Sequence, residues 1–216
     1  QEGDTIAERY LLEKKIGEGG MGMVFKAQDI KLAKTVAVKT ITNFHEEDES
    51  LVRFHREAKI ASNIDHPNVV KVYDFGIAGE YKPYLVMEYI EGATLKSFLK
   101  RTGPFDALSG LNVLKQIASG METVHREGII HRDLNEILVK LLDFGTARTF
   151  AAEEGFKTKT GIIIGTPRYL SPEQAREDNV DERSDIYSLG CLAYELFTGK
   201  PPFEADNVMT LIEMHL

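Results

Sequence analysis

Three glycines near the N-terminus, Gly17, Gly19 and Gly22, have the Gly-x-Gly-x-x-Gly spacing of loops that bind phosphate groups. Glycine lets the backbone turn tightly and brings N–H groups against phosphate oxygens. The same spacing fits a dinucleotide-binding turn, which requires a strand before the glycines and a helix that opens at them. Here a β-type segment, residues 21–25, follows instead. The pattern therefore favours a phosphate loop between two strands.

Lys39 lies among apolar residues of a predicted strand, Thr35–Ile41. An unpaired ammonium group would be costly there, so Lys39 requires anionic partners such as phosphate oxygens and a carboxylate. The candidate carboxylate is Glu57, three residues after Phe54 on a predicted helix over residues 50–64. The acidic residues 46–49 compete for this role, but they precede the apolar periodicity and are typical of an exposed charge run.

Two further motifs complete a set: His131-Arg132-Asp133-Leu134 and Asp143-Phe144-Gly145. With the glycine loop and Val36-Ala37-Val38-Lys39 they stand in the order of the protein-kinase signatures. The chain resembles the eukaryotic-like Ser/Thr protein kinases, from about Tyr10 to the last residue. The loop sequence Gly-Glu-Gly-Gly-Met-Gly and the stretch Ser171–Ala175 are most similar to those of the bacterial branch.

This resemblance implies phosphorylation of Ser and Thr hydroxyls on proteins, with ATP and Mg²⁺ as cofactors and Mn²⁺ as an alternative metal. Asp133 would accept the proton of the substrate hydroxyl, Asp143 would hold a metal ion, and Lys39 would pair with Glu57. Val24 and Ala37 would cover the adenine, Met87 would be the gatekeeper, and Glu88 and Tyr89 would lie in the hinge. The residues implied to contact ATP are Ile16, Gly17, Gly19, Gly22, Val24, Ala37, Lys39, Met87, Glu88 and Tyr89.

The segment after Asp133 departs from the family pattern. Kinases place a metal-binding Asn five residues after this Asp, but Leu138 stands there and the candidate, Asn135, comes three positions early. The strand-like runs 137–139 and 140–142 then follow each other directly, without the turn of at least two residues that a hairpin needs. We therefore predict that they cannot pair. Residues missing because of disorder, a deletion and a natural pseudokinase are the three explanations.

The segment between Asp143 and Glu173 resembles a kinase activation segment of normal length. Thr158 and Thr160 match positions that bacterial relatives autophosphorylate, and Arg132 is the expected cationic partner of a loop phosphate. Residues 165–173 resemble the stretch that docks the substrate, and Thr166-Pro167 has the Ser/Thr-specific form. As an alternative, both threonines are ordinary polar loop residues.

The predicted fold class is α+β, with the bilobal protein-kinase fold implied by the resemblance. We expect one kinase domain over residues 1–216. Its N-lobe, residues 1–91, would be a small antiparallel sheet with one main helix, and its C-lobe, residues 92–216, would be larger, helical and incomplete. The predicted strands are 10–16, 23–28, 35–41, 69–74 and 84–89, and the predicted helices are 50–64, capped by Ser50, 95–101, 110–127 and 185–198.

The composition of the chain limits which partners and which compartment are expected. The formal charge of −8 argues against nucleic acids, because phosphate binding needs a basic patch. The single cysteine, Cys191, is expected to be a small buried apolar residue and fits a reducing compartment. Buried Asp185 is expected to brace the catalytic loop, as in the family. No run of eighteen apolar residues exists. We expect a cytoplasmic kinase domain, with any membrane anchor in segments outside this chain.

The expected partners are protein substrates, ATP and, for autophosphorylation between molecules, a second kinase domain. Two rival functions remain. A pseudokinase that regulates partners is supported by the departure after Asp133. A small-molecule phosphotransferase of related fold is disfavoured by the peptide-docking stretch from Thr166 to Glu173.

Overall fold

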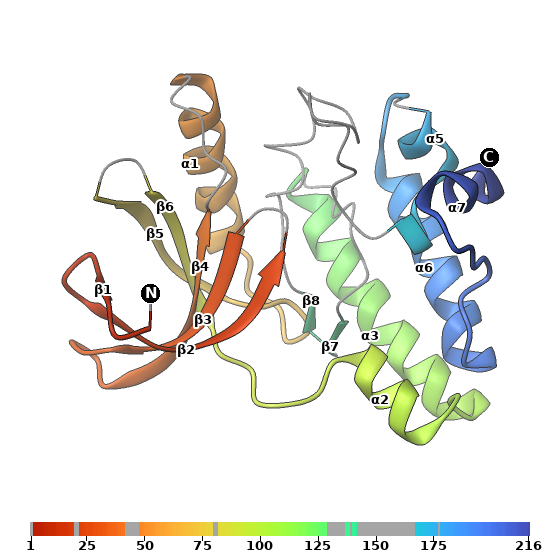
Figure 1. Ribbon diagram of the computed structural model, residues 1–216, viewed down its shortest axis with the longest axis horizontal. Coiled ribbons are helices and arrows are strands. Elements are labelled where there is room, and N and C mark those ends of the chain that lie inside the picture. The colour runs from red at the N-terminus through yellow and green to blue at the C-terminus, as the bar shows by residue number, and fades with distance from the viewer. Residues whose placement is uncertain are drawn as a thin grey trace. The chain divides into compact units, whose positions relative to one another are not determined.

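A computed structural model describes residues 2–19, 22–41, 48–79, 82–128, 137–138, 140–141, 167–176 and 178–216. The chain divides into two compact units (Figure 1). Unit 1 comprises residues 1–65 and 70–91, and unit 2 comprises residues 66–69 and 92–216. Unit 1 holds an antiparallel sheet with one helix and unit 2 is mainly helical, so the predicted kinase-type α+β architecture is confirmed.

The sheet of unit 1 has six strands in the order β1-β2-β3-β4-β6-β5, and every neighbouring pair is antiparallel. Alternation of side chains gives the sheet two different faces. One face carries a cluster of buried apolar side chains that includes Phe25, Val38 and Val86. The strands are β1 (Thr5–Ile6), β2 (Tyr10–Gly19), β3 (Gly22–Asp29), β4 (Lys34–Ile41), β5 (Val72–Ala78) and β6 (Lys82–Glu88).

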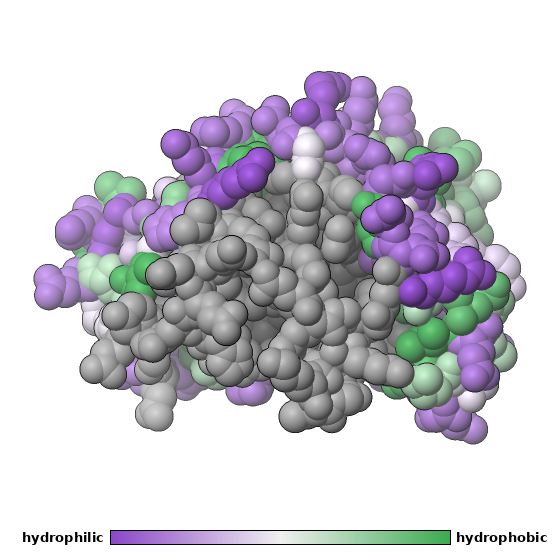
Figure 2. Space-filling model, turned by 90° about the horizontal axis from the view of Figure 1, so that it is seen from above, coloured by the Kyte–Doolittle hydropathy of each residue, from purple (hydrophilic) through white to green (hydrophobic). Residues whose placement is uncertain are grey.

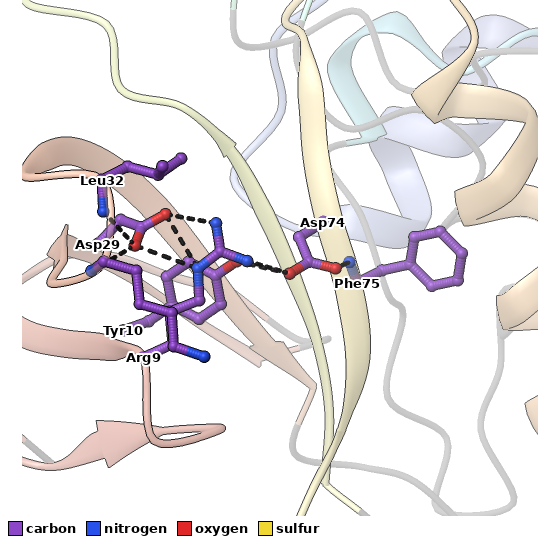
Figure 3. Close-up of polar contacts among 7 residues, drawn as sticks. Arg9, Tyr10, Asp29, Leu32, Asp74 and Phe75 are labelled. Atoms are coloured by element: carbon purple, nitrogen blue, oxygen red, sulfur yellow. Dashed lines mark hydrogen bonds and ion pairs between the residues drawn. The ribbon is translucent and has the colours of Figure 1, made fainter.

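A charged network joins three of these strands (Figure 3). Arg9 donates from Nη2 to Asp29 Oδ2 at 2.7 Å and from Nη1 to Asp74 Oδ2 at 3.3 Å. The Tyr10 hydroxyl donates to the same Asp74 oxygen at 2.6 Å. The backbone N–H of Leu32 also donates to Asp29, at 3.2 Å. Asp29 is buried, and these donors compensate its loss of hydration.

Helix α1 (Asp48–Ser62) packs on β5. Phe54, Ala58 and Ala61 are buried at helical spacing, and the Phe54 ring meets Phe75 edge-on with the centroids 6.4 Å apart. The predicted cap at Ser50 is wrong, because the helix already begins at Asp48. Acidic residues favour a first helical turn through the helix dipole, and apolar periodicity cannot reveal such a turn.

The strand predicted over residues 69–74 begins only at Val72. Val69 donates its N–H to the carbonyl of His66 at 3.0 Å, so residues 66–69 form a turn. Asn68 Nδ2 donates to Gln116 Oε1 at 3.1 Å, which ties this turn to unit 2. Val69 and Val70 are both buried, a pattern that resembles a strand in the sequence.

Unit 2 is built around α3 (Ala107–Arg126) and α6 (Glu182–Thr198), which contact each other. A Cβ at Gly110 on α3 would lie 2.3 Å from the Phe197 ring, so only glycine permits this approach. Gly199 ends α6 in the left-handed conformation, with φ 76°. The other elements are α2 (Leu95–Thr102), β7 (Ile137–Leu138), β8 (Lys140–Leu141), the 3₁₀ turn η1 (Pro167–Tyr169), α5 (Pro172–Ala175) and α7 (Val208–His215).

The strands β7 and β8 correct a prediction. Ile137 pairs with Leu141 and Leu138 with Lys140, so the two strands do pair. A single residue separates them. The expected minimum of two turn residues was too strict, because three-residue turns also reverse a chain.

Exposed apolar side chains gather on the last helices of unit 2. Those on α7 are Val208, Met209 and Met214. Apolar surface is visible at the same end in Figure 2. Among the described helices, none is both long enough and apolar enough to cross a membrane.

Candidate active site

The three glycines lie where β2 and β3 meet. Gly17 is opposite Val24, and Gly19 is opposite Gly22. The loop therefore connects two antiparallel strands, which argues against the dinucleotide-binding alternative with its helix. Gly22 has φ 150°, and a Cβ there would lie 1.9 Å from the carbonyl oxygen of Thr40. No other residue type fits at Gly22, because the backbone of Thr40 and Ile41 occupies the space that a side chain would need.

Strand register places the predicted nucleotide residues on one face of the sheet. Lys39 is opposite Val24 on β3 and opposite Leu85 on β6, while Ala37 is opposite Met87. Directly opposed residues in antiparallel strands share a face, as do residues two apart on one strand. Val24, Ala37, Lys39 and Met87 therefore lie on the face away from the Phe25 cluster.

Helix α1 packs on the same face as Lys39. Leu85, opposite Lys39, is itself opposite Phe75 on β5, and the Phe75 ring contacts Phe54 of α1. Glu57 follows Phe54 by three residues and precedes Ala61 by four, so it lies on the helical face that carries both. The side chain of Glu57 is not among those described. Its pairing with Lys39 stays a prediction, and the register supports it.

Lys39 is buried, with 7% of its surface exposed. Its neighbours on this face, Val24, Ala37 and Met87, are apolar, so the ammonium group needs an anion to compensate its desolvation. A phosphate oxygen and a carboxylate both satisfy that need.

Two further predicted ATP residues, Ile16 and Glu88, lie near the ends of β2 and β6. Ile16 is 46% exposed and stands at a register shift in β2, between Lys15 and Gly17. Glu88 ends β6, and its N–H donates to the carbonyl of Lys71 at 2.9 Å. The Glu88 amide is thus already used within unit 1, and a hinge N–H that binds adenine must come from another residue.

The stretch after Thr166 lies against α6. The hydroxyl of Tyr169 donates a hydrogen bond to the Glu195 carboxylate, and both residues are buried. Ser188 Oγ donates to the Tyr169 carbonyl at 2.7 Å. Ser184 Oγ donates a hydrogen bond to the Glu173 carboxylate. Burial raises the pKa of Glu173, but the bonds from Ser184 and from the backbone N–H of Glu173 outweigh this effect and hold the pKa below its usual value. Residues 169–173 are therefore held by side chains of one helix.

Asp185 is buried on α6, as expected. Its Oδ2 accepts a hydrogen bond from His125 Nε2 at 2.8 Å, from the last turn of α3. The catalytic loop that Asp185 was expected to brace is outside the described residues, so that role stays a prediction. Cys191 is buried and free, and burial raises the pKa of its thiol, as suits a structural apolar residue.

Five residues with buried polar contacts in unit 2 were not predicted from the sequence: His125, Tyr169, Ser184, Ser188 and Glu195. One signal was available for the α6 residues. Ser184, Ser188 and Glu195 recur four and seven residues apart on the helix face that also carries Cys191 and Leu192, which indicates a buried polar stripe.

Several predicted site residues lie outside the described ranges. They are Arg132, Asp133, Asn135, Asp143, Thr158, Thr160 and Thr166. Within the described ranges, no group of three His, Cys, Asp or Glu side chains is arranged to hold a metal ion. The predicted metal ligands, Asp143 and Asn135, belong to the undescribed part and stay predictions.

Comparison with known proteins decides the family. The family profile described as protein kinase domain matches residues 10–216. The chain belongs to this family. The glycine loop, Lys39 and the α6 stretch thus occupy positions within a kinase domain, and the predicted family is confirmed.

Curated relatives are bacterial kinases. The chain is 42% identical to the serine/threonine-protein kinase pkn3 of Myxococcus xanthus, over 99% of this chain and 42% of that protein. It is 41% identical to PknB of Mycobacterium tuberculosis over 98% of this chain and 36% of that protein. For PrkC of Bacillus subtilis the identity is 39%, over 99% and 34% of the two chains. The predicted bacterial branch is confirmed, and the chain spans less than half of each relative.

The pkn3 alignment covers 229 positions, more than the 216 residues of this chain. The relative therefore carries residues within the matched region that have no counterpart here. A shortened segment after Asp133 is consistent with this difference. Disorder, deletion and the pseudokinase alternative are not separated by it.

Proposed function

We propose that this chain is a Ser/Thr protein kinase that transfers the γ-phosphoryl group of ATP to hydroxyls of protein substrates, with Mg²⁺ as the divalent cation. The observation that carries this proposal is the single sheet face that bears Val24, Ala37, Met87 and the buried Lys39 beside the glycine hairpin. The relatives named Ser/Thr-protein kinases support the choice of substrate.

This face of the sheet offers different surroundings for the adenine and for the phosphates of ATP. Val24, Ala37 and Met87 offer apolar surface to the adenine ring, and burial of an aromatic ring against such surface is favourable. Glycine at positions 17 and 22 would let the backbone N–H groups come close to the phosphates. Lys39 supplies a positive charge between these halves.

Catalysis would divide between charge stabilisation and proton transfer. Lys39 would stabilise the phosphate oxygens, and Glu57 would keep the ammonium in place. Asp133 would accept the substrate proton, and Asp143, with Asn135 as the second candidate, would hold the divalent cation. A divalent cation supplies charge neutralisation at the phosphates. These assignments are proposals from the family motifs.

Regulation is proposed at Thr158 and Thr160. Each phosphate adds about −1.5 to −2 charge at neutral pH, and Arg132 would pair with it beside Asp133. Transfer between two kinase domains is the proposed route, which makes a second copy of the chain a partner. Cytoplasm is the compartment we propose, because ATP is the donor and the Cys191 thiol is free.

The pseudokinase alternative is favoured by one observation, Leu138 in the place of the metal-binding Asn. Phosphoryl transfer from ATP labelled at the γ-position separates the two. We expect label on Ser and Thr of a protein substrate in the presence of Mg²⁺, and loss of label in Asp133→Asn. Nucleotide binding without any label on substrate would support the pseudokinase.

A further inference from the structure

Lys26 on β3 lies on the same face of the sheet as the proposed adenine surface. It is opposite Ala37 on β4, and Ala37 is in turn opposite Met87 on β6. Directly opposed residues in antiparallel strands share a face, and so do residues two apart on one strand, such as Val24 and Lys26. The apolar surface proposed for adenine therefore has a lysine directly beside Ala37.

The stability of the sheet does not account for a lysine at this position. Lys14 on β2 stands opposite Lys26, and like charges that face each other across two strands reduce stability. Glu13 Oε2 lies 3.9 Å from Lys26 Nζ, but 41% of the Glu13 side chain and 35% of the Lys26 side chain are exposed. Ion pairs with this exposure contribute little.

The ammonium group of Lys26 lies against an aromatic ring. Its Nζ is 5.4 Å from the centroid of the Tyr89 ring, which is within the reach of a cation–π interaction, about 6 Å. Tyr89 is half-buried and follows Glu88, the last residue of β6, which pairs with Val36. The paired part of the strand thus ends one residue before Tyr89, and Lys26 connects the Tyr89 ring back to β3.

Holding the Tyr89 ring also restricts the main chain that follows β6. A tyrosine side chain has two rotatable bonds, so a fixed ring leaves few positions for the main chain that carries it. The N–H of Glu88 already donates to the Lys71 carbonyl at 2.9 Å, so a main-chain donor for adenine must come from another residue. A site whose main chain is ordered in advance loses less entropy when its ligand binds.

We propose that Lys26 is a positioning residue for the adenine of ATP and that it acts through the ring of Tyr89. This inference rests on the proposed kinase function. Lys26 neither reacts nor binds the phosphates. The two lysines on this face then have different tasks: Lys39 compensates the charge of the phosphates, and Lys26 orders the main chain at the adenine end. Lys26, Ala37 and Tyr89 all belong to unit 1.

Lys26→Met tests the proposal, because methionine keeps an apolar stem beside Ala37 and removes the charge. Three ligands separate the ways in which a lysine could act: ATP, adenosine, which has no phosphate, and inorganic triphosphate, which has no adenine. Dissociation constants are measured by calorimetric titration of the full chain. We expect those for ATP and adenosine to rise by the same factor, about threefold, and that for triphosphate to stay unchanged.

Two further substitutions test the route through Tyr89. Lys26→Arg keeps a cation that stacks on aromatic rings, so it should restore the affinity for adenosine. Tyr89→Leu removes the ring, and Lys26→Met/Tyr89→Leu should then bind adenosine no more weakly than Tyr89→Leu alone. The unfolding temperature of each variant is measured, and Lys26→Gln gives the same test if Lys26→Met does not fold.

Lys34→Met is the matched control. Lys34 Nζ lies 3.7 Å from the centroid of the Tyr73 ring, so this variant also removes a lysine and a cation–π contact from unit 1. Neither Lys34 nor Tyr73 is among the residues proposed to contact ATP. We expect Lys34→Met to bind adenosine and triphosphate as wild type does.

Unchanged affinity for adenosine in Lys26→Met would overturn the proposal. Weaker binding of triphosphate would do the same, because it indicates a direct charge effect on the phosphates or a general loss of structure. Additive losses in the double variant would show that Lys26 does not act through Tyr89. A wild-type protein that binds neither ATP nor adenosine contradicts the proposed kinase function itself, and the role of Lys26 is then excluded with it.

Discussion

Lys39 on β4 lies directly opposite Val24 on β3, so both side chains leave the sheet on one face. This is the face on which α1 packs, through Phe54 and Phe75. A buried ammonium group therefore lies beside apolar side chains and beneath a helix that carries Glu57. The arrangement matches a site where the phosphates and the adenine of one nucleotide need different environments.

The first prediction concerns the pair of Lys39 and Glu57. Lys39→Met and Glu57→Gln should each lower kcat/KM, by on the order of a hundredfold for the lysine. If the two side chains meet, the double variant should lose less than the sum of the single losses in transition-state free energy, with a coupling of about 1 kcal/mol or more. Steady-state kinetics of the four proteins measures this cycle. Additive losses would show that the pair does not form.

The second prediction concerns the glycine hairpin. Gly22→Ala should lower the unfolding temperature and abolish activity, because its Cβ would lie 1.9 Å from the Thr40 carbonyl oxygen. Gly17→Ala is the matched control, since its Cβ would make an ordinary contact of 3.7 Å with Val24. It should keep the unfolding temperature but raise KM for ATP by obstructing the phosphates. Equal thermal stability of the two variants would contradict this account.

The third prediction concerns acid stability. The Arg9 hydrogen bond holds the pKa of Asp29 below its usual value, against the effect of burial. Because the pKa of Asp29 is lower in the folded than in the unfolded state, its carboxylate stabilises the fold above the unfolded value, near 4. This stabilisation disappears as the pH falls through the lower folded value.

Urea unfolding of wild type and Asp29→Asn between pH 7 and pH 3 tests the direction of this pH dependence. The difference in unfolding free energy should be large at pH 7 and shrink toward pH 3. Asp65→Asn is the control, because Asp65 pairs with Lys71 at the surface with 82% of its side chain exposed, and such pairs contribute little. A difference for Asp29→Asn that stays constant with pH would contradict the assignment.

The fourth prediction concerns regulation. Incubation with Mg²⁺ and ATP should place phosphate on Thr158, Thr160 or both. Thr158→Ala/Thr160→Ala should reduce activity toward a protein substrate, since no phosphate remains to pair with Arg132. Phosphopeptide mapping and kinetics of the double variant measure both effects. Undiminished activity would remove loop phosphorylation as the switch.

Periodicity and motif order predicted much of unit 1 from the sequence. The strand around Lys39 and the helix around Phe54 each have a repeating apolar pattern that packing within unit 1 confirms. Local pattern could not predict where β5 begins, because Val69 and Val70 are buried like strand residues although residues 66–69 form a turn.

The local sequence pattern also could not predict the polar contacts of unit 2, because their partners lie far apart in the sequence. His125 meets Asp185 across 60 residues and Tyr169 meets Glu195 across 26. Nothing near a tyrosine in the sequence shows that its hydroxyl will be buried against a carboxylate. The prediction that β7 and β8 cannot pair was wrong, because it required a turn of at least two residues and a single residue separates the two strands.

Phosphoryl transfer by this chain can be measured by comparing wild type with a variant of the proposed proton acceptor. Phosphate incorporation into a protein substrate is measured for wild type and Asp133→Asn at saturating Mg²⁺ and ATP, with nucleotide affinity as the control. We expect incorporation by wild type and a loss of at least about a hundredfold in Asp133→Asn, with ATP affinity largely intact. Equal turnover in the two proteins would contradict the role of Asp133, and absence of transfer in both would contradict the kinase function.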